Sequence, residues 1–314
     1  KELGDIGGVI ARETGDKGVI TAHRWTVLKL IFLKRYVRDV YTPIVGNYYP
    51  CMVFIDLLAG TGLNKYESSN FFIPGSTLIA WSCAQYPFDK ILAVGYDRPQ
   101  NNPHYNSLHR RLVRFISPKS RLKLIKGDVN EKIDEIINEL KEMKEHCGGI
   151  HYLAFVDPNC HEVHFDTIRK LINLEEHGIY GDLIILLQAR LIARLIGSYI
   201  KDPGKGKSAE LDKFFGTKEW RNFTSEIEKN VIDLYKRKLE ELKQRPIIEI
   251  LDINLMRENI HYYLLYVTRR TRRGSPYTKA VELIKNFVKI VDKQDMVDKA
   301  IRRALGIETP LTLM

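Results

Sequence analysis

The sequence has few cysteines and no long apolar run. Its four cysteines, Cys51, Cys83, Cys147 and Cys160, form no C-x-x-C pair, so we expect neither a metal site nor a redox motif. The first three are expected to be buried thiols. No apolar run approaches the roughly 20 residues that cross a bilayer, and the polar start of the chain lacks the apolar core of a signal peptide. These absences predict a soluble, cytoplasmic protein without membrane contact.

Positive charge is abundant. Lysine and arginine number 49 against 39 acidic residues, a formal net charge of +10. Such a balance favours a polyanionic partner, most often nucleic acid. The 314 residues, 44% of them hydrophobic, suit one large domain or one domain with an appended piece.

Apolar runs alternate with helical stretches through the middle of the chain. Five runs that predict buried strands begin near residues 51, 91, 121, 151 and 182. Helical patterns between them favour parallel βαβ units. PIIEILDINL and HYYLLYVTRR, near the C-terminus, are close enough to pair antiparallel. The pattern predicts an α/β fold: a Rossmann-like, doubly wound, seven-stranded sheet with an antiparallel last strand.

The segments outside this rhythm define the expected domains. Residues 1–46 form an N-terminal tail and helix, of which the first 20 residues are a loose tail or short lid. Residues 47–200 and 247–314 form the sheet domain, which ends in two helices. Residues 201–246, with the amphipathic stretch SEIEKNVIDLYKRKLEELKQ, interrupt it as a helical insertion.

A glycine-rich turn follows the first strand in the sequence Asp56-Leu-Leu-Ala-Gly-Thr-Gly62. Glycines let the backbone turn tightly and approach a ligand at the carboxyl ends of the strands. Asp97 ends the second strand, where a carboxylate can accept both hydroxyls of a ribose. Its separation from the loop exceeds the roughly 20 residues of the dinucleotide fingerprint, which disfavours NAD.

Asp128 ends the third strand, where its side chain can bond an adenine amino group while Val129 packs on the ring. Each acid alone is more simply a helix N-cap. Acids at successive strand ends favour a nucleotide site.

The motifs D-L-L-A-G-T-G, G-Y-D, G-D-V and V-D-P-N-C resemble, in this order, those of class I S-adenosylmethionine-dependent methyltransferases, over roughly residues 50–190. The resemblance implies S-adenosylmethionine as cofactor, with the glycines at its methionine part, Asp97 at its ribose and Asp128 at its adenine. The residues implied in cofactor binding are Asp56, Ala59, Gly60, Thr61, Gly62, Asp97, Arg98, Asp128 and Val129.

Three further segments resemble the three-Cys-motif partner proteins, a branch of the same fold. They are H-R-W-x-x-x-K from His23, P-G-S-T from Pro74 and YYLLYVTRR from Tyr262. The chain departs from that branch at Asn159-Cys160, where the branch places an aromatic residue and glycine.

The fourth strand ends in Asp157-Pro158-Asn159-Cys160, which resembles the D-P-P-Y motif of enzymes that methylate exocyclic base amines. In such a loop the acidic and proline oxygens accept hydrogen bonds from the NH₂ group, so catalysis is mainly positioning. We expect Asp157 and Pro158 to orient the amine and Asn159 to shape the pocket. The stacking aromatic is missing; the possible substitutes are Phe165, His161, His164 and Trp25.

Cys160 supplies a rival mechanism, because C5-pyrimidine methyltransferases use a thiolate nucleophile. Related RNA enzymes usually carry a second cysteine at the next strand end, where this chain has Leu187-Gln-Ala-Arg190. Amine methylation is therefore favoured, with Cys160 as an inert small residue.

Two arginine clusters predict contacts to nucleic-acid phosphates. One follows the last strand and the other lies on the helix after the second strand; their members are Arg269, Arg270, Arg272 and Arg273, and Arg110, Arg111 and Arg114.

Together these features predict a methyltransferase that acts on an exocyclic amine in structured RNA, with cytidine N4 of ribosomal RNA as the specific hypothesis. Three alternatives stay open: a C5-cytosine RNA enzyme, a protein or small-molecule methyltransferase, and a non-catalytic partner that keeps the cofactor fold.

Overall fold

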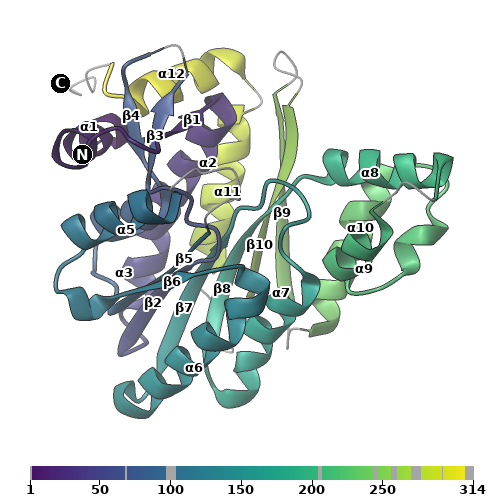
Figure 1. The fold of residues 1–314 in the computed structure, drawn as a ribbon, viewed down its shortest axis with the longest axis horizontal. Coiled ribbons are helices and arrows are strands. Elements are labelled where there is room, and N and C mark those ends of the chain that lie inside the picture. Colours follow the sequence, from purple (N-terminus) through teal and green to yellow (C-terminus); the bar gives the residue numbers. More distant parts are fainter. Residues whose placement is uncertain are drawn as a thin grey trace. The chain divides into compact units, whose positions relative to one another are not determined.

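The computed structural model describes residues 2–67, 69–96, 104–203, 207–242, 246–255, 260–269, 277–291 and 293–307. The chain divides into two compact units: unit 1 contains residues 1–128 and 276–314, and unit 2 contains residues 129–275. Helices follow most strands along the chain (Figure 1). No helix in the described ranges is long and apolar enough to span a membrane.

The main sheet confirms the predicted fold class. Its seven strands have the order β6-β5-β2-β7-β8-β10-β9, which is Rossmann-like, and β10 runs antiparallel to β8 and β9. The strands are β2 (Cys51–Asp56), β5 (Lys90–Gly95), β6 (Leu122–Lys126), β7 (Ile150–Val156), β8 (Tyr180–Leu187), β9 (Pro246–Leu255) and β10 (Ile260–Arg269).

Unit 1 contains β2, β5 and β6, which pair in parallel. The apolar run of β2 is almost entirely buried, which is typical of a central parallel strand. A small second sheet joins β1 (Ile20–Ala22), β3 (Leu63–Tyr66) and β4 (Phe72–Pro74). The helices are α1 (Leu3–Thr14), α2 (Arg24–Arg35), α4 (Ser76–Cys83), α5 (His104–Phe115), α11 (Tyr277–Val291) and α12 (Gln294–Ala304).

The prediction of a loose tail at residues 1–20 is wrong, because this segment contains α1 and β1. Leu3, Ile6 and Ile10 of α1 are buried, at helical spacing. Two glycines allow close packing of this helix: a Cβ on Gly7 would lie 2.1 Å from the Phe72 carbonyl oxygen, and one on Gly4 would lie 2.2 Å from that of Leu305. The glycines therefore serve helix packing rather than chain flexibility.

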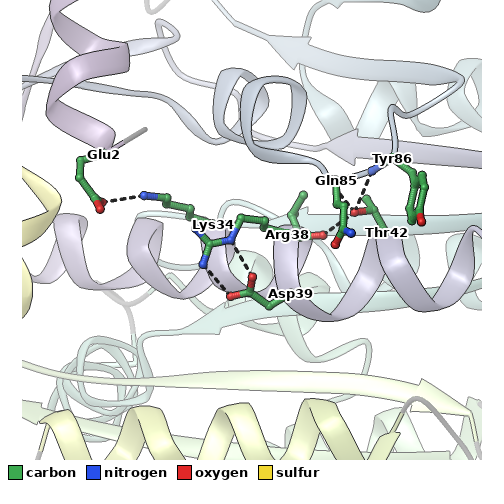
Figure 2. Close-up of polar contacts among 8 residues, drawn as sticks. Glu2, Lys34, Arg38, Asp39, Thr42, Gln85 and Tyr86 are labelled. Carbon is green, nitrogen blue, oxygen red and sulfur yellow. Dashed lines mark hydrogen bonds and ion pairs between the residues drawn. The ribbon is translucent and has the colours of Figure 1, made fainter. Parts of the chain in front are cut away.

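Polar contacts along the next helix also hold the N-terminus. α2 continues through a π-helical segment, η1 (Tyr36–Tyr41), into α3 (Thr42–Val45). Lys34, which is 6% exposed, donates from Nζ to Glu2 Oε2 at 2.7 Å, so its buried charge is paired. Thr42 Oγ1 donates to the Val37 carbonyl and accepts from the Gln85 backbone N–H at 3.1 Å. Figure 2 shows these contacts along one helix.

Unit 2 holds the other four strands and the predicted helical insertion. β7 pairs in parallel with β8, and β10 lies between β8 and β9. The helices are α6 (Val129–Cys147), α7 (Phe165–Ile172), α8 (Ala189–Lys201), α9 (Ser208–Phe215) and α10 (Ile227–Leu242). Tyr235 of the insertion stacks on Phe214 at 5.2 Å and meets Phe165 edge-on at 5.7 Å between ring centroids. These aromatic contacts pack the insertion onto α7.

The cysteines fall into two classes. Cys83 and Cys160 are free, whereas Cys51 and Cys147 are each disulfide-bonded. The expectation of a buried thiol therefore holds for Cys83 and is wrong for Cys51 and Cys147.

Candidate active site

The glycine loop of unit 1 has the backbone geometry that only glycine adopts freely. Gly60 and Gly62 have φ values of +59° and +78°, in the left-handed region. Gly75 packs directly against this loop: its N–H donates to the Gly62 carbonyl at 2.9 Å, and an added Cβ would lie 2.9 Å from Gly62 Cα. The P-G-S-T segment therefore has a structural task, which is to support the glycine loop.

Asp56 anchors the same loop. Its carboxylate is fully buried and accepts hydrogen bonds from Ser76 Oγ at 2.5 Å and Thr77 Oγ1 at 2.6 Å. A side chain with no exposed surface offers no atom to a ligand. The predicted direct cofactor contact of Asp56 is therefore wrong, and we assign Asp56 to positioning the loop against the start of α4.

Two neighbouring loop residues are also buried. The Ala59 N–H donates to the Val94 carbonyl at 3.0 Å, and Thr61 Oγ1 donates to the Leu63 carbonyl at 2.9 Å. Ala59 is 4% exposed and Thr61 is 1% exposed, whereas Gly60 is half-buried. Gly60 is thus the member of the predicted loop set best placed to meet a ligand through its backbone.

The prediction that Arg111 binds nucleic acid is wrong, because its side chain is fully buried. Nη1 donates to the Thr61 carbonyl at 2.7 Å, and Nη2 donates to the carbonyls of Lys17 at 2.8 Å and Gly15 at 3.3 Å. Burial, and secondarily the charge of Arg110, lowers the Arg111 pKa to about 10. The side chain ties the segment after α1 to the glycine loop.

Position 111 carries a sequence signal for this burial, because it shares the apolar face of α5 with Leu108 and Leu112. The other two members of that arginine cluster are exposed. Arg114 pairs with Glu13 at 2.7 Å. The cluster predicted on α5 therefore divides into one buried and two surface arginines.

The other predicted cofactor residues lie at strand ends. Asp128 is exposed just after β6, and Val129, 4% exposed, begins α6. Tyr96 directly follows β5 and is 51% exposed. Asp97 and Arg98 lie outside the described residues. Each parallel strand of unit 1 thus ends in a group suited to an adenosyl ligand: a glycine turn, an aromatic ring or a carboxylate.

The predicted amine loop, Asp157-Pro158-Asn159-Cys160, begins where β7 ends in unit 2. Asp157 is half-buried and Pro158 is buried. The Pro158 carbonyl accepts a hydrogen bond from Gln188 Nε2 at 3.1 Å. Asn159 turns toward Glu162, to which it donates from its backbone N–H at 2.9 Å and from Nδ2 at 3.1 Å. Asn159 therefore stabilises the loop itself, while Asp157 and Pro158 stay at the strand end.

Tyr262 is a site residue that sequence reasoning missed. It is 3% exposed, and burial raises its pKa, with the charge of Asp157 as a second cause. Tyr263 pairs with Leu187, so Tyr262 is level with Gln188. Because β10 is antiparallel, its first residues lie at the edge where β7 and β8 end. The antiparallel direction of β10 was the sequence signal that could have placed Tyr262 at this edge. Tyr262 is therefore a neutral phenol close to Asp157.

The environment of Cys160 disfavours nucleophilic catalysis. Burial raises its thiol pKa, and the charge of Glu162 raises it further. A thiol of this kind is protonated near neutral pH and lacks the thiolate that C5-pyrimidine chemistry requires. Burial, followed by the charge of Lys207, lowers the pKa of the neighbouring His161. Lys207 belongs to the insertion, whose charge therefore reaches this loop.

Two of the four possible stacking substitutes, Phe165 and Trp25, pack against other aromatic rings. Phe165 is 4% exposed and meets the ring of Tyr235 edge-on. Trp25, in unit 1, stacks on His23 at 4.2 Å between ring centroids. Within the described ranges, no group of three or more His, Cys, Asp or Glu side chains could hold a metal ion.

Arg269 lies at the opposite end of β8 from the amine loop. Its guanidinium lies 3.8 Å from the ring centroid of Tyr180, which is the first residue of β8. Gln188, which contacts the amine loop, directly follows the last residue of β8. Eight strand residues separate these ends, a span of about 26 Å at the usual rise. Arg269 therefore lies far from the amine loop, and its predicted role in binding the nucleic-acid backbone stays a prediction. Arg270, Arg272 and Arg273 lie outside the described residues.

No family model and no curated protein matches the sequence. The solved structures that resemble the chain include protein LPL1258 from Legionella pneumophila, of family model DUF519 (11% identity, TM-score 0.50, 84% of this chain and 91% of that one). They also include the methyltransferase domain of bacterial CtHen1-C (10%, TM-score 0.39, 78% and 100%). A third is human Methyltransferase-like protein 13 in complex with SAH (11%, TM-score 0.35, 84% and 89%). At such identity the likeness to the Legionella protein is one of fold, and it agrees with the Rossmann-like sheet described above.

Proposed function

We propose that the protein transfers a methyl group from S-adenosylmethionine to an exocyclic amine of an RNA base. One observation carries the proposal: the Pro158 carbonyl, beside Asp157 at the end of β7, already accepts an amide N–H from Gln188 at 3.1 Å. An oxygen that accepts a hydrogen bond from an amide NH₂ can also accept one from a base NH₂, which is a donor of the same kind.

The residues of unit 1 fit the proposed cofactor. Gly60 combines a positive φ with partial exposure, so its backbone is open to a ligand. The exposed ring of Tyr96 and the exposed carboxylate of Asp128 follow the neighbouring strands, where ligands of open α/β sheets bind. When bound, S-adenosylmethionine supplies a methyl group on a sulfonium, which is already activated toward a nitrogen lone pair.

The task left to the protein is orientation. Asp157 and the Pro158 carbonyl accept the two N–H groups of the amine and so direct its lone pair. The Gln188 amide fixes the Pro158 carbonyl, and Tyr262 keeps its proton beside Asp157 because its pKa is raised. The carboxylate of Asp157 is also able to accept the proton that the methylated nitrogen loses.

In its specific form the proposal names cytidine N4 of ribosomal RNA. The net charge of +10 supports an RNA substrate. The acceptor oxygens of Asp157 and Pro158 favour an exocyclic amine over a ring carbon as the methylated atom. The raised pKa of Cys160 weighs against C5 methylation.

The proposal is tested by nucleoside mass spectrometry of total RNA from cells with and without the gene, complemented by wild type, Asp157→Ala or Asp166→Ala. Asp166 is an exposed acid on α7 that pairs with Arg169, so its variant is the matched control. We expect one methylated nucleoside to disappear and to return with wild type and Asp166→Ala only. An RNA profile unchanged by loss of the gene would refute an RNA substrate.

A second function is favoured by Asn159, which occupies the place of the usual second proline and turns its amide to Glu162. With Cys160 in place of the aromatic, the loop lacks its usual stacking group. Both features suit a partner protein that keeps the cofactor fold without catalysis. Calorimetry with S-adenosylmethionine, together with the methylation test above, separates the enzyme from the partner protein. A partner protein would bind S-adenosylmethionine weakly, or would bind it without methylating RNA.

A further inference from the structure

We propose that the solvent face of α8 is the surface on which the RNA backbone docks, an inference that rests on the proposed function. Arg190, Arg194 and Lys201 lie at spacings of four and seven residues, so they share one side of the helix. We call them the α8 stripe. The buried residues Ala189, Ile192 and Ile196 mark the other side. The stripe therefore faces away from the core of unit 2.

Two of the three charges of the stripe have no acidic partner within the described residues. No acidic residue occurs between Ala189 and Lys201. Arg194 and Lys201 are exposed and form no ion pair within the part of the chain that the structure describes. Unpaired like charges along one helix face repel one another, and a row of phosphates relieves that repulsion.

The neighbouring helix α10 is a useful contrast. There Lys236 pairs with Glu240, Arg237 with Glu241, and Lys238 with Glu241. Basic residues on α10 are thus neutralised by acids of the same helix, as on an ordinary solvated surface. The two helices belong to one unit and pack together (Figure 1), so the difference is local to α8.

The stripe also begins at the amine loop. α8 starts directly after Gln188, whose side chain holds the Pro158 carbonyl. At the helical rise, Arg194 lies about 6 Å beyond Arg190 and Lys201 a further 10 Å or so along the axis. A nucleic-acid strand that follows α8 would reach the amine loop. Arg269, at the far end of β8, offers no such path.

The form of α8 favours contact with the backbone rather than with bases. Gly197 lies within the stripe, and an added Cβ there would meet nothing within 4 Å. Leu191 and Ile200, 37% and 47% exposed, flank it. The only aromatic residue of α8, Tyr199, packs against Trp220 at 5.0 Å between centroids. Without a free stacking platform, we expect binding to depend on charge more than on sequence.

The test measures fluorescence anisotropy of a fluorescein-labelled oligo-uridine of twelve nucleotides between 50 and 200 mM KCl. The main variant is Arg190→Gln/Arg194→Gln/Lys201→Gln, and Arg194→Gln/Lys201→Gln changes exposed side chains alone. The control, Lys213→Gln/Lys229→Gln/Lys236→Gln, removes the same charge from exposed or half-buried positions on α9 and α10. Circular dichroism and calorimetry with S-adenosylhomocysteine verify that each variant is folded and retains its cofactor site.

We expect the triple α8 variant to lose about tenfold or more in affinity and to flatten the slope of log K against log salt by about 2, since each phosphate contact to a single strand contributes about 0.7. The double variant should show about two-thirds of that slope change, and the control should follow wild type. Unchanged binding by the α8 variants, or an equal loss in the control, would overturn the docking surface.

The outcomes separate the docking surface from the proposed function. Normal methylation by an α8 variant with an unchanged salt slope removes the surface and leaves the enzyme. A wild-type protein that binds no S-adenosylmethionine, yet shows the α8-dependent slope, removes the enzyme and supports the surface.

Discussion

The glycine loop of unit 1 and the amine loop of unit 2 use polar residues in opposite ways. Around the glycine loop, Asp56, Thr61 and Arg111 are fully or almost fully buried and bonded to protein groups. In the amine loop Asp157 stays half-buried and Asn159 exposed at the strand end. A buried polar group fixes the backbone because an unpaired one is costly. In the first loop, therefore, buried side chains fix the shape and leave the backbone of Gly60 partly exposed, whereas in the second the side chain of Asp157 is itself partly exposed.

Substitution of Asp157 should give the largest effect on function. Asp157→Ala removes one of the two amine acceptors, and we expect kcat to fall by about 10² or more, the usual cost of a lost positioning group. Stability should change little, because Asp157 is half-buried at a strand end.

Asp56→Ala should show the converse. It leaves the buried hydroxyls of Ser76 and Thr77 without their acceptor, for about 2–4 kcal/mol of destabilisation. Urea unfolding and methyl-transfer kinetics on both variants test the contrast. If Asp157→Ala is the more destabilising of the two, the division between a structural and a reactive carboxylate is mistaken.

Arg111→Met should be the next largest change. Three backbone carbonyls lose a charged donor, which we expect to cost about 3 kcal/mol. Because one of these carbonyls belongs to Thr61, affinity for S-adenosylhomocysteine should fall as well. Arg110→Met, on the exposed side of the same helix, should stay within about 0.5 kcal/mol of wild type.

Denaturation and calorimetry on this pair measure both quantities. Equal effects at the two positions would mean that Arg111 does not support the glycine loop.

The outline of the fold could be predicted because apolar runs and turn residues mark each strand of the main sheet. The helix over residues 3–14 could not, since its glycines are typical of a flexible segment until their close approach to the backbone of Phe72 and Leu305 is known. Arg111 was misplaced for a related reason. Three arginines close together indicate a surface, and only the helical phase of Leu108 and Leu112 separates the buried one.

Strand direction explains the positions of two further residues, Tyr262 and Arg269, that the sequence analysis did not foresee. An antiparallel β10 brings Tyr262 to the edge where β7 ends and carries Arg269 to the opposite edge. The sequence predicted that direction, and the consequence for both residues follows from it. Contacts such as that between Gln188 and Pro158, 30 positions apart, depend on side-chain geometry that a sequence pattern does not contain.

The thiols give a smaller test of the amine loop. Burial raises the pKa of Cys160, so its alkylation by iodoacetamide should be slow at pH 7 and accelerate only in alkaline solution. Cys160→Ala should keep kcat within about threefold of wild type if the thiol takes no part in the reaction. Stopped-time alkylation followed by mass spectrometry, alongside kinetics of the variant, checks both statements. Loss of activity in Cys160→Ala, combined with rapid alkylation at neutral pH, would restore the C5-pyrimidine mechanism.

The smallest expected effect is a pH dependence of stability from His161. Burial, with Lys207 as the second cause, holds its pKa below the ordinary 6.5, so near pH 6 the unfolded chain binds more protons at this position than the folded chain. Stability should therefore rise with pH between the folded pKa and 6.5, and this contribution should be lost as pH falls through that window. His161→Gln should flatten the dependence of the urea midpoint on pH between 5 and 7, whereas His146→Gln, on the exposed end of α6, should leave it unchanged. Because Lys207 of the insertion contributes to the shift, Lys207→Gln should weaken the same dependence. If it does not, the charge of the insertion is too distant to act on the amine loop.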